Sequence, residues 1–347
     1  MTAFPPTATG TALRRYQDNF PRHLIGVTRQ LETRIMERLD TEFGHRGLRL
    51  SFEPYISLAA GAGARLSSVA DSLGVSRQAA NSVVDALEQL GYLARQPDPD
   101  DGRAKRLVLT AGGALLRQDG LTVAADLQRE CGLIISRKRL AASCRTLHSL
   151  LEQLPETPAA SLAALRLTPA NARLPALLPR LADFLNRSLM DLTTAKGHPG
   201  LKLSYGQVLT LIGPEGGRMQ AMAALHKVSK QAIGAVVNEL QGLGYIERRP
   251  DPDDARQVLL HFTAAGLGLI TDSVAAIDEV ESQLRALVGR EALAQLQAAL
   301  RDLYCAMQPE PGFAPTTGIS ALARELIASL GAERARQLGA LLTQANP

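Results

Sequence analysis

The chain has 347 residues, of which 46% are hydrophobic and 21% are charged, and its formal net charge is +4. The length suggests about two domains, and the composition is that of a globular, mainly helical protein with small sheets. The first residues lack the pattern of a signal peptide, and no apolar run reaches about 18 residues, the length of a membrane span, so we expect a cytoplasmic protein that contacts no membrane.

Apolar residues at helical spacing predict four helices in the first part of the chain. Serine is a good residue to begin a helix, because its side-chain oxygen accepts a hydrogen bond from an exposed backbone N–H, and glycine often ends one. The predicted helices are Leu13 to about Phe43, a short helix near residues 51–61, a helix that begins at Ser67 or Ser68 and ends at Leu73, and a helix that begins at Ser76 and ends at Gly91.

Two short strands are predicted after the fourth helix, at Tyr92–Gln96 and Lys105–Thr110. The segment between them is rich in proline and aspartate and contains Gly102, which is typical of a loop. The two strands therefore form a β-hairpin arm. A helix, a turn, a second helix and such an arm follow the plan of a winged helix-turn-helix domain.

The remaining chain is predicted to be helical again from Ala114 to Leu154 and then to form a proline-containing linker at residues 155–171. The same order of elements follows, with helices to about Met307. The last residues are predicted to form two short helices.

The strongest signal in the sequence is an internal repeat. Ser76–Gly113 aligns without a gap on Ser229–Gly266, each position shifted by 153 residues, and 20 of the 38 paired positions are identical. The sequence PDPDD occurs in both copies, at Pro97–Asp101 and at Pro250–Asp254. This period has the size of a domain and greatly exceeds the roughly 20–50 residues of solenoid repeats. One chain therefore carries two copies of one domain.

In both copies the helix begins Ser-Arg/Lys-Gln and closes with Leu-Gly-Tyr, and PDPDD, an arginine two residues later and a terminal Leu/Phe-Thr follow. This string resembles the MarR family of bacterial transcriptional regulators, and the resemblance extends over roughly residues 13–308. Because that family typically forms homodimers with interlocking terminal helices, the resemblance implies two winged-helix domains fused into an intrachain pseudo-dimer. The implied parts are residues 1–154 and 172–308, with a linker at 155–171 and a helical extension at 309–347.

The start of the fourth helix and its copy are the predicted DNA-reading surface. Helix N-termini favour phosphate, arginine binds guanine or phosphate, and glutamine and asparagine can read adenine. Asp85 and Glu88, further along the helix, are expected to face away from the DNA backbone. The predicted recognition residues are Ser76, Arg77, Gln78, Asn81 and Ser82 in the first copy and Ser229, Lys230 and Gln231 in the second.

The hairpin arm, or wing, is the second predicted DNA contact, because arginine suits the narrow and electronegative minor groove. Asp101 and Asp254, two residues before the tip arginines, are predicted to orient these arginines by bidentate pairs. The predicted wing contacts are Arg103, Lys105 and Arg106 in the first copy and Arg256 in the second, where Val258 and Leu259 replace Lys105 and Arg106.

The two copies differ at the reading surface, since Gly234 and Ala235 replace Asn81 and Ser82. A fused chain need not read two identical half-sites. We therefore expect double-stranded DNA with an imperfect palindrome, its half-sites about 10 bp apart and the first copy reading more strictly.

The resemblance also implies a cleft between the terminal helices and the winged domain, where a small aromatic or phenolic effector loosens DNA binding. The ligand-binding residues are not known from the sequence, and Phe20 and His23 are only candidate lining residues. Some relatives sense peroxide through a cysteine early in the first helix. That region has no cysteine here, so peroxide sensing is not expected.

Other functional classes have less support. The three cysteines lack metal-ligand spacing, the six histidines are scattered, and neither a nucleophile motif nor a phosphate-binding glycine loop occurs, so we expect no enzyme, metal or cofactor. An RNA role is disfavoured because the deep A-form groove excludes a recognition helix. The main alternative is a winged-helix module that contacts proteins and does not bind DNA.

Overall fold

The computed structural model describes residues 8–99, 101–154, 168, 173–214, 216–219, 222, 230–251 and 258–307. Every described residue lies within Met1–Met307, which forms one compact unit by its internal contacts. The predicted linker, apart from Thr168, and the predicted extension at 309–347 lie outside the described residues.

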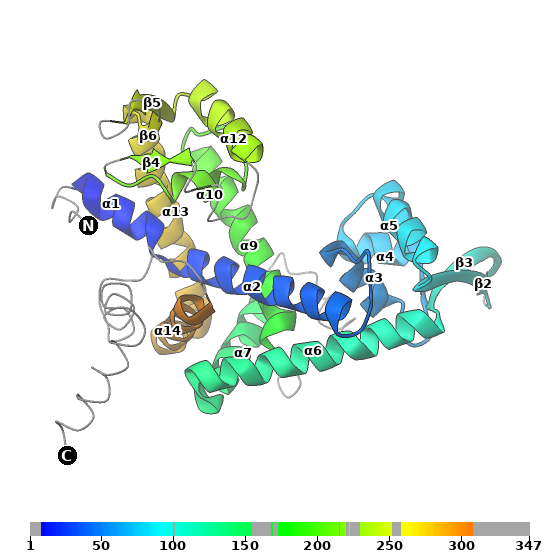
Figure 1. The fold of residues 1–347 in the computed structure, drawn as a ribbon. Coiled ribbons are helices and arrows are strands. Elements are labelled where there is room, and N and C mark those ends of the chain that lie inside the picture. Colours follow the sequence, from blue (N-terminus) through cyan, green and yellow to red (C-terminus); the bar gives the residue numbers. More distant parts are fainter. Residues whose placement is uncertain are drawn as a thin grey trace, which may run out of the picture. The chain divides into compact units, whose positions relative to one another are not determined.

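The first half of the chain contains α1 (Ala8–Gln17), α2 (Phe20–Thr41), the 3-10 helix η1 (Leu50–Phe52), α3 (Glu53–Leu58), β1 (Ala64–Arg65), α4 (Leu66–Leu73), α5 (Arg77–Gln89), β2 (Leu93–Asp98), β3 (Asp101–Leu109), α6 (Ala111–Ile135) and α7 (Arg137–Gln153) (Figure 1). The second half contains α9 (Leu174–Ala195), α10 (Tyr205–Leu209), β4 (Gly217–Arg218), α12 (Lys230–Gly242), β5 (Ile246–Pro250), β6 (Val258–Phe262), α13 (Ala264–Val288) and α14 (Arg290–Met307).

Each half contains a small antiparallel sheet of the same topology. The strand order is β1-β3-β2 in the first half and β4-β6-β5 in the second. The predicted hairpin is confirmed, although β3 begins four residues earlier than expected. The outer strands β1 and β4 have only two residues each, too few to show the alternation that predicts a strand. We call residues 50–109 the first winged lobe and the described part of 205–262 the second winged lobe.

The helix that precedes the hairpin begins and ends as predicted. The Ser76 hydroxyl accepts a hydrogen bond from the backbone N–H of Ala79 at 3.1 Å, and Gly91 has a φ of 78°, a left-handed conformation that glycine adopts without strain. Gly74 ends α4 with a φ of 65°, also as predicted. The predicted serine cap of α4 is wrong, because that helix begins at Leu66 after Arg65.

The single helix predicted from Leu13 to about Phe43 is in fact two. The chain breaks between α1 and α2, where Asn19 accepts a hydrogen bond from the N–H of Arg22 at 2.8 Å and Pro21 occupies the first turn of α2. An asparagine followed two residues later by a proline is a helix-start signal, and the prediction from apolar periodicity alone did not take it into account.

The helices α1, α2, α6, α7, α9, α13 and α14 form a helical body whose core mixes the two halves. Its hydrophobic cluster includes Leu24, Leu147, Leu181 and Leu300, each with 0% exposed surface. Helix α2 of the first half contacts α9 and α14 of the second, and α7 contacts α14. Neither half therefore completes this core alone.

The second winged lobe has a separate core of its own, built from residues such as Val208, Val237 and Leu260. Helix α1, at the other end of the sequence, docks on this lobe. The side-chain amide of Gln17 donates to the carbonyl oxygens of Thr210 and Ile212, each at 3.1 Å. The first half thus also contacts the second through its N-terminal helix.

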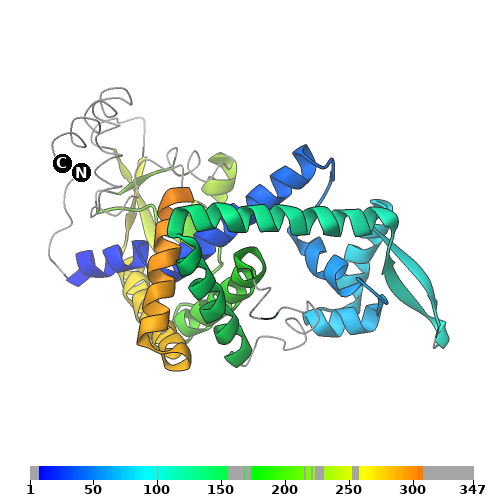
Figure 2. The ribbon, with the colours of Figure 1, turned by 90° about the horizontal axis from the view of Figure 1, so that it is seen from below.

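Each long helix that follows a wing begins with the same close contact. In Figure 2, the long helix α6 continues directly from the two long strands of the first wing. Thr110 caps α6 by accepting a hydrogen bond from the N–H of Gly113 at 3.0 Å. A Cβ atom on Gly113 would lie 2.0 Å from the carbonyl oxygen of Tyr92, at the base of β2. In the second copy, Thr263 caps α13 and a Cβ on Gly266 would lie 1.9 Å from the carbonyl oxygen of Tyr245. Glycine at these positions brings the helix against the wing.

Candidate nucleic-acid interface

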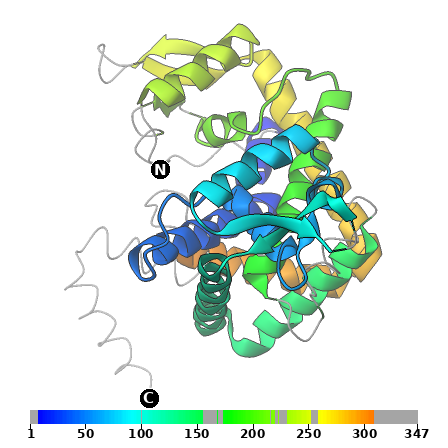
Figure 3. The ribbon, with the colours of Figure 1, turned by 90° about the vertical axis from the view of Figure 1, so that its right-hand side faces the viewer.

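The start of α5 is an exposed polar surface on a firmly anchored helix. Ser76, Arg77, Gln78 and Ser82 are all exposed. The opposite face of the helix is buried through Ala80, Val84 and Leu87, each with 0% exposed surface. Contacts between α5 and β2 place the helix beside the wing (Figure 3). These four predicted recognition residues therefore point to solvent from a helix that cannot rotate without breaking its core contacts.

The second lobe presents the copy of this helix in the same way, as far as it is described. Gln231 is exposed, whereas Ile233, Val237 and Leu240 are buried. Ser229 and the side chain of Lys230 lie outside the described part of the chain.

Asn81, one of the predicted recognition residues, has both ends of its amide engaged within the protein. Its Nδ2 donates to Asp85 at 3.0 Å, and its Oδ1 accepts from Arg95 of β2 at 2.9 Å. Arg95 also pairs with Asp85 at 2.8 Å and with Glu88. These hydrogen bonds use one N–H and one acceptor site of the amide, and the role of Asn81 in reading a base stays a prediction.

The buried aspartate of the first wing is Asp98. Asp98 has a side chain with 0% exposed surface and accepts a hydrogen bond from Arg65 Nε of β1 at 2.6 Å. Arg106 of β3 places Nη2 3.4 Å from the same carboxylate. One buried carboxylate thus joins all three strands of the sheet. Asp101, for which the orienting role was predicted, is exposed and lies at the start of β3.

The second wing repeats this buried pair, since Arg218 Nε donates to Asp251 at 2.8 Å and the side chain of Asp251 has 0% exposed surface. All three aspartates of PDPDD occur in both copies, so the motif alone could not show which one is buried. The missing signal was the arginine partner, because Arg65 and Arg218 are also 153 residues apart.

Two of the predicted wing contacts, Lys105 and Arg106, lie on β3. Lys105 is exposed, which agrees with its predicted role, whereas Arg106 is half-buried beside Asp98 and donates to the carbonyl of Ala62 at 3.2 Å. The side chain of Arg103 and all of Asp254 and Arg256 lie outside the described residues.

A second duplicated network links each winged lobe to a long helix. His45 Nδ1 lies 3.2 Å from the hydroxyl of Tyr92, and its Nε2 lies 2.8 Å from Asp119 of α6. His198, Tyr245 and Asp272 repeat this arrangement at 3.0 and 2.9 Å. Burial raises the pKa of both tyrosines. All three residue pairs are 153 residues apart, and the histidine and aspartate pairs lie beyond the aligned segment in which the repeat was recognised.

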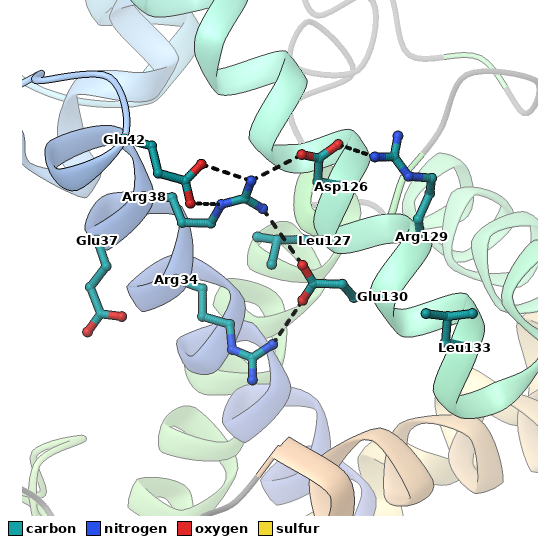
Figure 4. A pocket seen from close by; sticks show the side chains of 9 residues that line it. All are labelled: Arg34, Glu37, Arg38, Glu42, Asp126, Leu127, Arg129, Glu130 and Leu133. Carbon is teal, nitrogen blue, oxygen red and sulfur yellow. Dashed lines mark hydrogen bonds and ion pairs between the residues drawn. The ribbon is translucent and has the colours of Figure 1, made fainter.

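A solvent-open cavity of about 690 Å³ lies between α2 and α6 (Figure 4). Arg38 stands at its centre, with Glu42 at 2.7 Å and Asp126 at 3.1 Å, and hydrogen bonds to Glu42 raise its pKa. Three arginines and four acidic residues line the cavity together with two leucines. Such a lining of mutually paired charges suits an aromatic ring poorly.

The two residues suggested for an effector cleft lie elsewhere. Phe20 is buried, and the ring of His23 lies 5.0 Å from that of Tyr304 in α14. His23 Nε2 also lies 2.8 Å from Asp18, whose pKa is lowered chiefly by this hydrogen bond. Phe20 belongs to the core of the helical body and His23 contacts α14, so neither residue lines the cavity between α2 and α6.

Within the described residues, no helix is long and apolar enough to cross a bilayer. The same residues contain no group of three or more histidines, cysteines or acids arranged to hold a metal ion.

A helix, a turn, an exposed second helix and a three-stranded wing define a winged helix-turn-helix fold in the first lobe, and the described part of the second lobe agrees with it. Two segments of the chain, residues 57–104 and 200–257, match the model of the MarR family. They fall on the two winged lobes. The comparison therefore supports a MarR-type winged helix in each half.

Individual proteins give more distant matches. The chain is 29% identical over 114 residues to the "Putative transcriptional regulatory protein for hcr operon" of Thauera aromatica, covering 33% of this chain and 67% of that protein. A MarR-family transcriptional regulator from Rhodococcus sp. RHA1 matches with a TM-score of 0.32 and 23% identity, over 37% of this chain and 90% of its own. CouR from Rhodococcus jostii RHA1, bound to p-coumaroyl-CoA, matches with the same TM-score and identity, over 40% of this chain and 94% of its own.

Proposed function

We propose that this protein is a MarR-type transcriptional regulator that binds one pseudo-palindromic operator with its two winged lobes. The observation that carries the proposal is the exposed start of α5, where Arg77 and Gln78 follow the Ser76 cap, and its repetition at Gln231 in α12. An arginine and a glutamine side by side at a helix N-terminus supply phosphate attraction and base-edge hydrogen bonds together.

The proposed arrangement is a pseudo-dimer within one chain, with residues 1–154 and 172–308 in the place of two protomers. The shared core of α2, α7, α9 and α14 supports it, because helices of one half pack on helices of the other. A linker at 155–171 joins the two units in this proposal, and 309–347 forms an added helical extension.

The two half-sites are proposed to lie about 10 bp apart and to differ in sequence. The first lobe reads its half-site more strictly, because Ser82 in α5 is replaced by Ala235 in α12 and Asn81 by Gly234. Footprinting that showed two equally stringent half-sites would refute this difference.

A small aromatic or phenolic effector is proposed to loosen DNA binding by preferring a conformation that does not bind DNA. The cavity between α2 and α6 is not assigned to it, because a lining of paired charges suits an aromatic ring poorly. A panel of phenolic acids, added to the protein–DNA complex, tests the proposal, and release of DNA by none of them would contradict it.

The central test measures binding of the purified protein to DNA from upstream of its own gene, by fluorescence anisotropy. We expect Gln78→Ala to weaken binding to the operator relative to unrelated DNA by about 1–3 kcal/mol. Gln89→Ala is the matched control, because Gln89 is exposed at the far end of the same helix. Equal operator preference in the two variants would remove α5 from the interface.

The wing is tested through salt dependence. We expect Arg103→Ala and Arg256→Ala each to lower the slope of log K against log[salt] by about one, the effect of losing one phosphate contact. A protein that binds operator and unrelated DNA equally weakly would favour the alternative, a winged-helix module for protein contacts.

A further inference from the structure

The two winged lobes differ in charge at one equivalent arginine. Arg95 of β2 lies against α5, where Nη2 donates to Asp85 at 2.8 Å and to Asn81 at 2.9 Å, and Nη1 pairs with Glu88. Two carboxylates thus surround one guanidinium, so this cluster carries a formal charge of −1. Only 20% of the Arg95 side-chain surface is exposed.

Arg248 of β5 occupies the same place in the second lobe, 153 residues later. Its Nη2 donates to the amide oxygen of Asn238 at 2.6 Å, and its Nη1 donates to that of Gln241. Asn238 and Gln241 replace Asp85 and Glu88, so both partners are neutral and the cluster keeps a formal charge of +1. Arg248 is also exposed, whereas Arg95 is not.

The clusters lie on the face of the helix that carries the recognition glutamine. Positions 78, 81, 85 and 88 are spaced by three or four residues and form one stripe along α5. The corresponding stripe on α12 consists of positions 231, 234, 238 and 241. At about 1.5 Å per residue, the carboxylate at 85 lies only ~10 Å along the axis from position 78. A helix that places Gln78 against base edges brings this stripe near the phosphates that border the groove.

We propose that Arg248 is a phosphate-binding residue of the second lobe and that Arg95 is not one in the first. Neutral amide oxygens orient the planar guanidinium without cancelling its charge, whereas the two carboxylates that hold Arg95 cancel it and repel phosphate. The inference rests on the proposed DNA binding and deepens it.

The two lobes then hold DNA by different means. The first lobe has an exposed cation on the wing, Lys105, where the second lobe has Val258. The second lobe has its cation at the base of the recognition helix, close to Arg249, which is itself paired with Glu247 at 2.5 Å. Backbone contacts position a protein and base contacts specify the sequence. Arg248 therefore gives the second lobe a sequence-independent contact at a position where the first lobe has none.

The repeat provides its own exchange experiment. In Asn238→Asp/Gln241→Glu the second lobe receives the acids of the first, and in Asp85→Asn/Glu88→Gln the first lobe receives the amides of the second. Each exchange preserves side-chain shape. Binding to a duplex of unrelated sequence is measured between 50 and 200 mM salt, after circular dichroism has confirmed that each variant is folded.

We expect Arg248→Ala and Asn238→Asp/Gln241→Glu each to lower the salt slope by about 0.9, the value for one phosphate. Between 50 and 200 mM salt, the fold-decrease in the binding constant of each variant is then roughly 3.5 times smaller than that of the unmodified protein. Asp85→Asn/Glu88→Gln is expected to raise the slope by a similar amount. Unchanged slopes in both second-lobe variants, with the unmodified protein binding DNA, overturn this inference alone. Failure of the unmodified protein to bind any DNA overturns the proposed function itself.

Discussion

The close approach of α6 to the wing gives the sharpest test of the structure. A Cβ on Gly113 would lie 2.0 Å from the Tyr92 carbonyl oxygen, whereas a Cβ on Gly120, in the same helix, meets nothing within 4 Å. Real Cβ contacts begin near 3 Å, so Gly113→Ala requires the helix and the wing to separate by about 1 Å. Gly120→Ala requires no movement.

The two substitutions add the same methyl group to one helix. The difference between their free energies of unfolding therefore chiefly reports the contact between residue 113 and the Tyr92 carbonyl oxygen. Replacing an interior helical glycine by alanine stabilises by up to about 1 kcal/mol, and we expect this gain for Gly120→Ala. Overpacking costs about 1–3 kcal/mol. We therefore expect Gly113→Ala to be less stable than Gly120→Ala by about 1–3 kcal/mol.

Urea denaturation followed by circular dichroism measures both free energies of unfolding. The second copy repeats the experiment, because a Cβ on Gly266 would lie 1.9 Å from the Tyr245 carbonyl oxygen while Gly268 has nothing within 4 Å. If Gly113→Ala and Gly266→Ala proved as stable as their partners, the described docking of the long helices on the wings would be wrong.

Three further predictions concern the wing, the helix cap and the thiols. Asp98→Ala should lower the free energy of unfolding of the first lobe, measured in urea, by about 1–3 kcal/mol. This is less than for a fully buried ion pair, because the side chain of Arg65 is 40% exposed and can be hydrated. An unchanged free energy of unfolding would show that the carboxylate does not hold the sheet together. Ser76→Ala should cost about 1 kcal/mol by the same measurement, and Ser76→Asp, which retains a capping oxygen, should restore most of it. Burial raises the pKa of Cys131 to about 11, so that only about 10⁻³ of it is thiolate at pH 8. Iodoacetamide should therefore modify the less buried Cys305 before Cys131 in the folded protein. If Cys131 reacted at the same rate before and after unfolding, this would argue against its burial.

Much of the winged lobe could be predicted because its signals are local. Ser76 and Gly91 mark the ends of α5 by their own chemistry, and the buried face follows from the spacing of Ala80, Val84 and Leu87. The hairpin followed from its loop composition, and the internal repeat supported each of these predictions twice.

The contacts that sequence reasoning missed join residues far apart in the chain. The pair of Arg65 and Asp98 and the network of His45, Tyr92 and Asp119 depend on how strands and helices pack. Local patterns carry no such information, and Asp98 could not be told from Asp101 within PDPDD. Alignment of the two copies beyond the similar segment would have indicated Arg65, His45 and Asp119, because each of them recurs as an identical residue at the same offset.

The separation of α1 from α2 shows a different limit. Apolar residues continue across Asn19 without a change of period, so periodicity predicts one helix, and only the cap and Pro21 reveal two. The break matters because it frees α1 to dock on the second lobe through Gln17.

A core shared by two halves of one polypeptide forms in a unimolecular step. Dilution does not weaken such a core, whereas a homodimer of separate chains comes apart at low concentration. A single substitution in this chain also alters only one of the two lobes, whereas a substitution in a homodimer alters both subunits at once. The single chain thus permits the lobes to diverge independently while their ratio stays at one to one.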